Sequence, residues 1–393
     1  MPGSVILSGA RTPIGKLAGS LAGFEATDLG GIAIAEAIRR AGLTPDQVDY
    51  VFMGQVLLAG AGQMTARQAA VKAGVPMSVP ATTVNKVCLS GLNAVVLADL
   101  YIQAGLADIV VAGGMESMTN APYLLPGARA GLRMGDGKVV DSMMFDGLFC
   151  AIDQLAMGAG TEKYAATRGL SREVQDELAA LSHERAAKAQ KDGLFEAEIV
   201  NVEIPQRKGD PLLFTTDEGV RVETTLDSLG ALRPAFDKAG NITAGNASQI
   251  SDGGSAMIVA SQAAAERLGI APMARVLGYG QVAGPDASLL DQPANAINDA
   301  LARAGMKVGD IDLFELNEAF AAVGVASMET LGIDASVTNV NGGAIALGHP
   351  IGMSGNRVVL HLINELRRRG GGKGAAALCG GGGQGDALLV ETL

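Results

Sequence analysis

Short apolar runs alternate with longer amphipathic segments over the first part of the chain. The apolar runs predict buried strands at 5–10, 48–57, 81–85 and 108–113. The amphipathic segments predict helices at 28–42, 63–73 and 89–103, the first of them capped by Asp28. Because strands that alternate with helices form βαβ units, the pattern predicts an α/β fold with a parallel sheet.

The same pattern returns late in the chain. The segment 33–49 matches 296–312 without a gap in its alanine, isoleucine, arginine and aspartate positions. A match of this length predicts two related α/β halves, an internal duplication at the scale of a domain. In this register the strand-to-helix turn that carries Cys88 corresponds to the turn that carries His349. We expect these two groups to face each other across a pseudo-twofold axis.

Between the halves the alternation of strands and helices stops. From about residue 122 to residue 243 the chain gains charge, glycine and methionine, and it holds one clear helix, which Ser171 caps. Because long connections often carry function, we expect this insertion to fold over the sheet and cover a site. The alternative is a peripheral decoration without ligand contact.

The amino-acid composition of the chain argues against some classes of binding partner. The chain has 30 Lys and Arg against 41 Asp and Glu, a formal net charge of −11, which argues against nucleic acid or an anionic membrane as a partner. Low charge and 54 glycines favour a homo-oligomer. No run is long and apolar enough to span a membrane and no signal peptide is recognisable, so we expect a cytoplasmic protein. The three widely spaced cysteines predict neither a disulfide framework nor a metal site.

One glycine-rich stretch, 339–355, holds the candidate functional histidine, His349. It lies between an apolar run expected to form a strand, 337–340, and a helix expected from about Ser354. The proline that follows His349 restricts its backbone, and the glycines leave room for a bulky group beside the ring. The alternative is a tight turn whose histidine merely makes a structural hydrogen bond. The two other histidines lie on helical segments without such clearance.

Cys88 stands where a predicted strand ends and a predicted helix begins. A thiol at a helix N-terminus feels the positive end of the helix dipole, which lowers its pKa and favours a reactive thiolate. The alternative is a small buried hydrophobe, the common state of a free cysteine. Its position favours a functional role for Cys88.

Cys379 ends a predicted strand and opens the glycine run 380–385, which fits the dinucleotide pattern G-x-G-x-x-G. Another predicted strand, 386–391, follows at once, so no βαβ unit can form there and the dinucleotide hypothesis fails. Bare backbone N–H groups after a cysteine instead suit an oxyanion hole. Asn317 also follows a predicted strand, where the alternative is an ordinary helix cap.

With these motifs the sequence resembles the thiolase family over nearly its whole length. Its four signature blocks stand in order as Asn-x-x-Cys-x-Ser-Gly, Asn-Glu-Ala-Phe, Gly-His-Pro and Cys-Gly-Gly-Gly-Gly. The resemblance implies a thiolase-like α/β fold of two duplicated βαβαβαββ halves with an inserted loop domain, usually as a homotetramer. The expected domains are an N-terminal half at 1–121 completed by 250–271, a loop domain covering the CoA site at 122–249, and a C-terminal half at 272–393.

The resemblance also implies an activity: condensation of two acetyl-CoA molecules to acetoacetyl-CoA and CoA, and the reverse thiolysis. Coenzyme A is a substrate in this chemistry, and no cofactor is implied. The implied catalytic residues are Cys88 as nucleophile, His349 and Cys379 as bases, and Asn317 and Gly381 at oxyanion sites. The positions that match family residues for binding CoA or the acyl group are Met157, Arg221, Phe236, Ala244 and Ser248.

The chain departs from many acetoacetyl-CoA thiolases at Ala156, where they carry a histidine, and over 282–293. Both regions lie near the acyl end of the family's pocket, so a 3-ketoacyl-CoA thiolase of broader chain length, acting in fatty-acid β-oxidation, is the alternative. A β-ketoacyl synthase uses a histidine or an asparagine where this chain has Cys379, and a Cys-His-Asn hydrolase gives Cys379 no role. A non-catalytic acyl-CoA-binding scaffold has no reason to keep two thiols and a base together.

Overall fold

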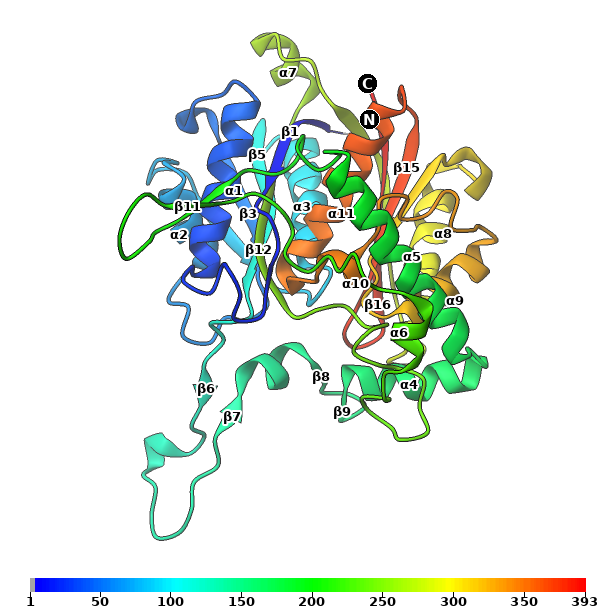
Figure 1. Cartoon of the computed structure of the whole chain (residues 1–393). Coiled ribbons are helices and arrows are strands. Elements are labelled where there is room, and N and C mark those ends of the chain that lie inside the picture. The colour runs from blue at the N-terminus through cyan, green and yellow to red at the C-terminus, as the bar shows by residue number, and fades with distance from the viewer. Residues whose placement is uncertain (1–3) are drawn as a thin grey trace.

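A long mixed sheet runs through the computed structural model, which describes residues 4–393 (Figure 1). Residues 1–3, the start of the first expected domain, lie outside the described residues. The main path through the sheet runs β14-β15-β16-β13-β1-β12-β5-β3-β4, and β2 (Gly15–Lys16) pairs with β12. The strands of this path are β1 (Val5–Arg11), β3 (Tyr50–Gly54), β4 (Ala81–Val84), β5 (Ile109–Ser117), β12 (Ser251–Ala260), β13 (Ala274–Ala283), β14 (Leu313–Leu316), β15 (Lys373–Gly380) and β16 (Gln384–Thr392).

The two halves contribute matching parts of this sheet. β3 is parallel to β4 and β5, and β14 is parallel to β15, but the strands between them pair antiparallel. The expectation of a parallel sheet is therefore wrong for its centre. One cause is the short glycine turn between β15 and β16, because a hairpin joins antiparallel strands. The pair β1–β13, with Val5 opposite Arg275, connects the halves.

Helices cover both outer faces of the sheet and fill the space between its halves. α1 (Ala26–Arg40) and α2 (Thr65–Lys72) cover the N-terminal half, and α8 (Gln292–Ala304), with α9 (Ala321–Leu331) beside it, covers the C-terminal half (Figure 1). α3 (Ser90–Gln103) and α11 (Ile351–Arg368) lie in the middle. Three clusters of buried apolar side chains, one for each of these helix layers, form the core. α7 (Gln262–Leu268) follows β12.

The two central helices cross with their backbones almost in contact. A Cβ atom added to Gly91 would lie 2.8 Å from the backbone N of Asn356, and one added to Gly355 would clash with the backbone N of Leu92. Only glycine permits such an approach. α11 also begins earlier than the expected start near Ser354. The crossing holds the N-termini of α3 and α11 close together.

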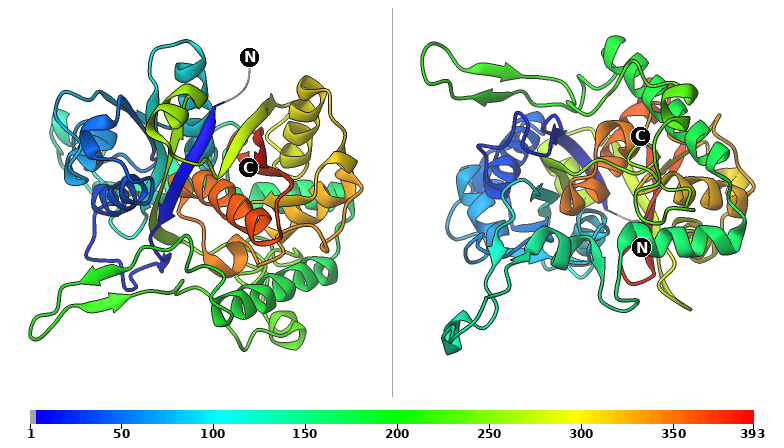
Figure 2. Two further views of the ribbon diagram at one scale, coloured as in Figure 1. Left: turned by 90° about the horizontal axis from the view of Figure 1, so that it is seen from above. Right: turned by 60° about the horizontal axis from the view of Figure 1, so that its bottom comes forward.

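The insertion packs over the C-terminal half and sends two arms outward. Its helices are α4 (Met157–Arg168), α5 (Arg172–Lys191) and α6 (Leu226–Gly230), and α5 follows Ser171 as predicted. The pair β6–β7 (Tyr123–Leu124 and Val140–Asp141) and the pair β10–β11 (Val202–Ile204 and Leu212–Phe214) extend from the body (Figures 1 and 2). β8 (Phe149–Cys150) pairs with β9 (Leu155–Ala156). The domain boundaries given above stay a prediction.

The predicted strand at 337–340 is wrong. Within this run only Thr338 forms a bridge, to Phe314 of β14. The reason is Asn339, whose side-chain amide accepts from the Leu316 N–H and donates to the Leu316 carbonyl, both at 2.8 Å. A side chain thus takes the hydrogen bonds that a strand backbone would otherwise make.

The predicted cap of the first helix is also wrong. Glu25 occupies the cap position, and Asp28, in the first turn, accepts a hydrogen bond from the Glu25 N–H at 2.9 Å. The two residues form a reciprocal capping box, which the sequence pattern did not separate from a simple aspartate cap. Among residues 4–393, no helix combines the length and the apolar character needed to cross a membrane.

Candidate active site

Cys88 lies in a tight turn between β4 and α3. Val87 adopts a left-handed φ of 52°, a strained conformation for a β-branched residue. The Ser90 hydroxyl holds the turn, since it accepts from the Lys86 N–H at 2.8 Å and donates to the Val87 carbonyl at 2.6 Å. The turn therefore presents Cys88, a half-buried residue, at the start of α3.

His349 lies in the equivalent turn, between the short helix α10 (Ala344–Leu347) and α11. Gly348 has a φ of 108°, and a Cβ atom there would clash with the Ser251 hydroxyl. His349 Nδ1 lies 2.6 Å from Ser354 Oγ, which itself donates to the Pro350 carbonyl at 2.9 Å. Because a hydroxyl carries one proton, Ser354 accepts from Nδ1–H. The other ring nitrogen, Nε2, is left with its lone pair.

His349 Nε2 lies in a buried environment. His349 is 7% exposed, and the side-chain nitrogen of Asn317 lies 3.4 Å from Nε2. Burial, helped by the positive charge of Arg357, lowers the pKa of His349 to about 3. The imidazole is therefore neutral at neutral pH and able to accept a proton from a neighbouring thiol.

The Cys88 thiol differs from the sequence-based expectation of a lowered pKa. Burial, helped by the negative charge of Glu116, raises its pKa to about 12. The backbone N–H groups of Cys88 and Gly381 oppose this rise without cancelling it. Cys88 is therefore a neutral thiol in the free protein, and a base has to take its proton when it reacts.

Cys379 ends β15, directly before the glycine turn that leads into β16. Its side chain is 1% exposed, and burial, together with the nearby Cys88, raises its pKa well above the ordinary value. Gly383 in the turn has a φ of 72°, and a Cβ atom there would clash with the Asp286 carbonyl, so this position requires glycine. The hairpin therefore brings a second thiol, and the N–H of Gly381, close to Cys88.

An apolar pocket of about 250 Å³ opens at Cys88 and His349. Its walls come from both halves of the molecule and from the insertion. Three of the residues expected to bind substrate also line it: Met157, Phe236 and Ser248. A small apolar chamber with a thiol and a neutral base at one end can hold an acyl thioester for attack by sulfur.

The other expected site residues lie in three places. Asn317 and Cys379 are buried beside the pocket, one at His349 and one at Cys88. Gly381 lines an adjoining pocket of about 730 Å³. Arg221 and Ala244 are exposed on the insertion and line neither of these two pockets. A role for them in binding CoA stays a prediction.

Sequence reasoning missed two residues that organise the site. Ser354 fixes the tautomer of His349, as described above. Glu116, at the end of β5, accepts hydrogen bonds from the backbone N–H groups of Val56, Leu57 and Gly352 at 3.0, 3.0 and 2.9 Å. Burial raises the pKa of Glu116 to about 7. Neither residue carries a sequence signal, because only the fold brings their partners together.

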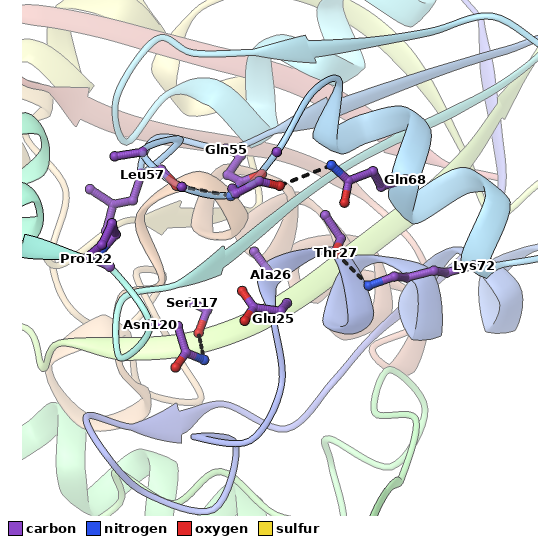
Figure 3. A pocket seen from close by; sticks show the side chains of 15 residues that line it. Glu25, Ala26, Thr27, Gln55, Leu57, Gln68, Lys72, Ser117, Asn120 and Pro122 are labelled. Carbon is purple, nitrogen blue, oxygen red and sulfur yellow. Dashed lines mark hydrogen bonds between the residues drawn. The ribbon is translucent and has the colours of Figure 1, made fainter. Parts of the chain in front are cut away.

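A separate pocket of about 360 Å³ lies beside α1 and α2 (Figure 3). Its ionic and amide-bearing lining residues are Glu25, Gln55, Gln68, Lys72 and Asn120. None of the expected site residues lines it, and the Lys72 ammonium already donates to Thr27 at 2.7 Å. Within residues 4–393, no three His, Cys, Asp or Glu side chains are placed to hold a metal ion. The candidate site is therefore the pocket at Cys88 and His349.

The chain matches two family models in succession. Residues 4–263 match the thiolase N-terminal domain, and residues 270–392 match the thiolase C-terminal domain. The chain therefore belongs to the thiolase family, as its motifs predicted.

Individual relatives are similar along their whole length. A probable acetyl-CoA acetyltransferase of Mycobacterium tuberculosis is 56% identical over 391 residues, with 100% of both chains covered. The crystal structure of the Bacillus anthracis acetyl-CoA acetyltransferase matches with a TM-score of 0.97 at 39% identity, covering 100% of this chain and 99% of that one. Human mitochondrial 3-ketoacyl-CoA thiolase matches with a TM-score of 0.96, the same identity and the same coverage. The predicted thiolase fold is thereby confirmed.

Proposed function

We propose that the chain is an acetyl-CoA C-acetyltransferase, which condenses two acetyl-CoA molecules to acetoacetyl-CoA and CoA and catalyses the reverse thiolysis. The observation that carries this proposal is the convergence of the Cys88 thiol, the neutral His349 imidazole and the Cys379 thiol at one pocket. The bacterial relatives reported above carry the name acetyl-CoA acetyltransferase. Coenzyme A is a substrate and a product in this reaction.

In the first half-reaction His349 Nε2 takes the proton of Cys88 while the sulfur attacks the acetyl carbonyl of acetyl-CoA. The backbone N–H groups of Cys88 and Gly381 stabilise the oxyanion of the tetrahedral intermediate. When the bond to the CoA sulfur breaks, the imidazolium returns its proton to the leaving thiolate. The products are acetyl-Cys88 and free CoA, and His349 is neutral again.

In the second half-reaction the neutral His349 Nε2 takes the thiol proton of Cys379, and the resulting thiolate removes a proton from the methyl group of another acetyl-CoA. Its raised pKa makes this thiolate a strong base. Asn317 donates to the enolate oxygen, and His349 can donate only while its Nε2 is protonated. The enolate carbon then attacks the acetyl-Cys88 carbonyl, the new C–C bond forms and the C–S bond breaks. Acetoacetyl-CoA leaves, the Cys88 thiolate takes the proton held by His349, and Cys379 keeps the proton from the methyl group, so both thiols and the imidazole are neutral again.

A 3-ketoacyl-CoA thiolase of broader chain length is the second candidate. The observation in its favour is Ala156, a small residue that lines the pocket where many acetoacetyl-CoA thiolases carry a histidine. The pocket also shares Val87, Gly147 and Met157 with the adjoining pocket of about 730 Å³, which offers room for a longer chain. The volume of about 250 Å³ at Cys88 itself suits a short acyl group better.

Thiolysis of 3-ketoacyl-CoA substrates of increasing chain length tests the proposal. We expect kcat/KM to fall at least about tenfold from acetoacetyl-CoA to the six-carbon substrate, and to fall further with eight carbons. A flat or rising profile would contradict acetyl specificity and favour the second candidate. No thiolysis of any member would overturn the thiolase chemistry itself.

Assembly, location and domain limits complete the proposal. We propose a cytoplasmic homotetramer, with the boundaries 1–121 plus 250–271, 122–249 and 272–393. The exposed apolar side chains on the arm between β6 and β7 support an oligomer, among them Leu132, Met134 and Val139. Light scattering on the purified protein would test the tetramer, and a monomer at micromolar concentration would contradict it.

A further inference from the structure

One buried ion pair links the turn of the nucleophile to the hairpin of the second thiol. Lys86 stands two residues before Cys88, and its Nζ lies 2.6 and 2.9 Å from the two carboxylate oxygens of Asp386. The Asp386 side chain is fully buried, and that of Lys86 is 24% exposed. The pair therefore spans the two halves of the molecule at the level of the reactive sulfurs.

The position of Asp386 ties it to Cys379. In the β15–β16 hairpin Asp386 lies opposite Leu378, and the next pair along the ladder is Gly385 opposite Cys379. Lys86 is tied to Cys88 in the same way, because its N–H donates to Ser90 at 2.8 Å and so belongs to the turn that the serine holds. Each charge is thus fixed to the backbone that carries one of the two thiols.

The carboxylate has a network of partners. Burial raises the pKa of Asp386, and hydrogen bonds from Lys86, Gln281 and Asn93 act against this rise. A buried ion pair adds little stability compared with apolar side chains of the same size, because both charges lose their water. The ion pair instead fixes geometry, because short hydrogen bonds to both carboxylate oxygens hold the Lys86 ammonium in one position.

We propose that Lys86 and Asp386 are positioning residues that hold the Cys88 turn against the Cys379 hairpin for the condensation step. The proposal rests on the proposed function. Neither residue lines the pocket at Cys88, so both act through the backbone rather than by touching substrate. The first half-reaction uses Cys88 and His349, which the crossing of α3 and α11 already holds together. From the hairpin it takes only the N–H of Gly381, beside which the N–H of Cys88 remains. The second also needs Cys379 at the right distance from acetyl-Cys88, and this is the distance that the ion pair spans.

The test compares the two half-reactions in Lys86→Met/Asp386→Asn. Replacing Lys86 or Asp386 alone would leave the other charge buried and unpaired, which can prevent folding. The double variant removes both charges together and avoids this problem. We expect acetylation of Cys88 by acetyl-CoA to slow less than about fivefold, and condensation to slow about 20- to 100-fold, the effect of a misplacement near 1 Å. The KM for acetyl-CoA should change less than about twofold, because no binding contact is lost.

A matched control and a rescue sharpen the test. Lys72→Met/Asp28→Asn removes an ion pair between α1 and α2 on the outer face and should leave both half-reactions within about twofold of the unaltered protein. The single substitution Lys86→Arg keeps the positive charge, so its condensation rate should be higher than that of the double variant. Equal slowing of both half-reactions, or condensation within about twofold of the unaltered protein, would overturn the positioning role. Failure of the unaltered protein to acetylate Cys88 or to condense acetyl-CoA would instead overturn the proposed function.

Discussion

The Cys88 turn and the His349 turn occupy equivalent places in the two halves, yet they are built differently. The first follows a regular strand, β4, and its strain lies in the left-handed Val87. The second follows the short helix α10, and the run that corresponds to β4 is reduced to one bridge at Thr338. Each turn relies on a serine of the following helix, Ser90 in one and Ser354 in the other.

Burial drives both reactive groups toward their neutral forms. It raises the pKa of Cys88 to about 12 and lowers that of His349 to about 3. His361 is equally buried and behaves differently. Burial acts to lower its pKa, but the Glu198 carboxylate, 3.0 Å from its Nδ1, and the Glu315 carboxylate together outweigh burial, and the pKa rises. The site therefore pairs a neutral base, His349, with a neutral thiol, Cys88, and charge separates between them only during the reaction.

Removing the thiol from the first turn has the largest expected effect. Cys88→Ala should lower the condensation rate at least about 10⁴-fold, because no acetyl-enzyme can form without the nucleophile. Cys150→Ala is the matched control, since Cys150 is also a free cysteine but belongs to neither turn. It should keep activity within about twofold. Comparable losses in both variants would show that the effect comes from folding rather than chemistry.

A substitution of Cys379, which lies outside both turns, should slow the second half-reaction much more than the first. In Cys379→Ala the condensation rate should fall about 10³-fold, because the base for the second acetyl-CoA is missing. Acetylation of Cys88, followed by mass spectrometry, should stay within about fivefold, because the Cys88 thiol, the His349 base and the backbone N–H groups of Cys88 and Gly381 all remain. Loss of acetylation in this variant would contradict the division of roles between the two thiols.

The pKa values of the two turns predict a simple pH profile. Since the pKa of Cys88 is raised to about 12, its thiolate fraction, and its rate of alkylation by iodoacetamide, should rise about tenfold per pH unit from pH 8 to pH 10, above the Glu116 pKa of about 7. His349, with a pKa of about 3, should add no inflection between pH 5 and pH 8. A plateau below pH 8 would mean that the free protein holds a thiolate and that the turns are already charged.

Loosening the second turn should have a smaller effect. Ser354→Ala removes the acceptor for His349 Nδ1–H and frees the ring to adopt the other tautomer. We expect kcat to fall about tenfold with little change in KM, and both half-reactions to slow together, because His349 serves in each. A change in KM alone would indicate that Ser354 acts on binding rather than on the base.

The smallest effect is expected for an exposed side chain that belongs to neither turn. Arg221 is exposed on the insertion, where an arginine can attract the phosphates of CoA. Arg221→Ala should raise the KM for CoA in thiolysis about fivefold and leave kcat unchanged, as for a uniform binding contact. An unchanged KM would remove Arg221 from the CoA site.

Most of the fold and of the candidate site could be predicted from local features of the sequence. The duplication was visible because 33–49 and 296–312 share their helical pattern, and the reactive residues were visible because glycine or a change of periodicity marks each turn. The family models confirm the fold that these features indicated. The antiparallel centre of the sheet was not predicted, because periodicity gives strands but not their partners.

Features that depend on burial could not be predicted. The helix-dipole argument gave the wrong direction for the pKa of Cys88, because it omitted the cost of burying a thiolate and the charge of Glu116. The apolar run at 337–340 satisfied the pattern of a strand, but the side chain of Asn339 replaced the backbone pairing. Both errors come from contacts between segments far apart in the chain.

The neutral Cys88–His349 pair is expected to form an acetyl-enzyme. The most direct test is intact mass spectrometry of the protein after brief exposure to acetyl-CoA, with peptide mapping and with Cys88→Ala as the control. We expect one acetyl group on Cys88, absent from the control, which passes into acetoacetyl-CoA when more acetyl-CoA is added. Condensation without an adduct on Cys88, or an adduct that cannot be passed on, would contradict this expectation.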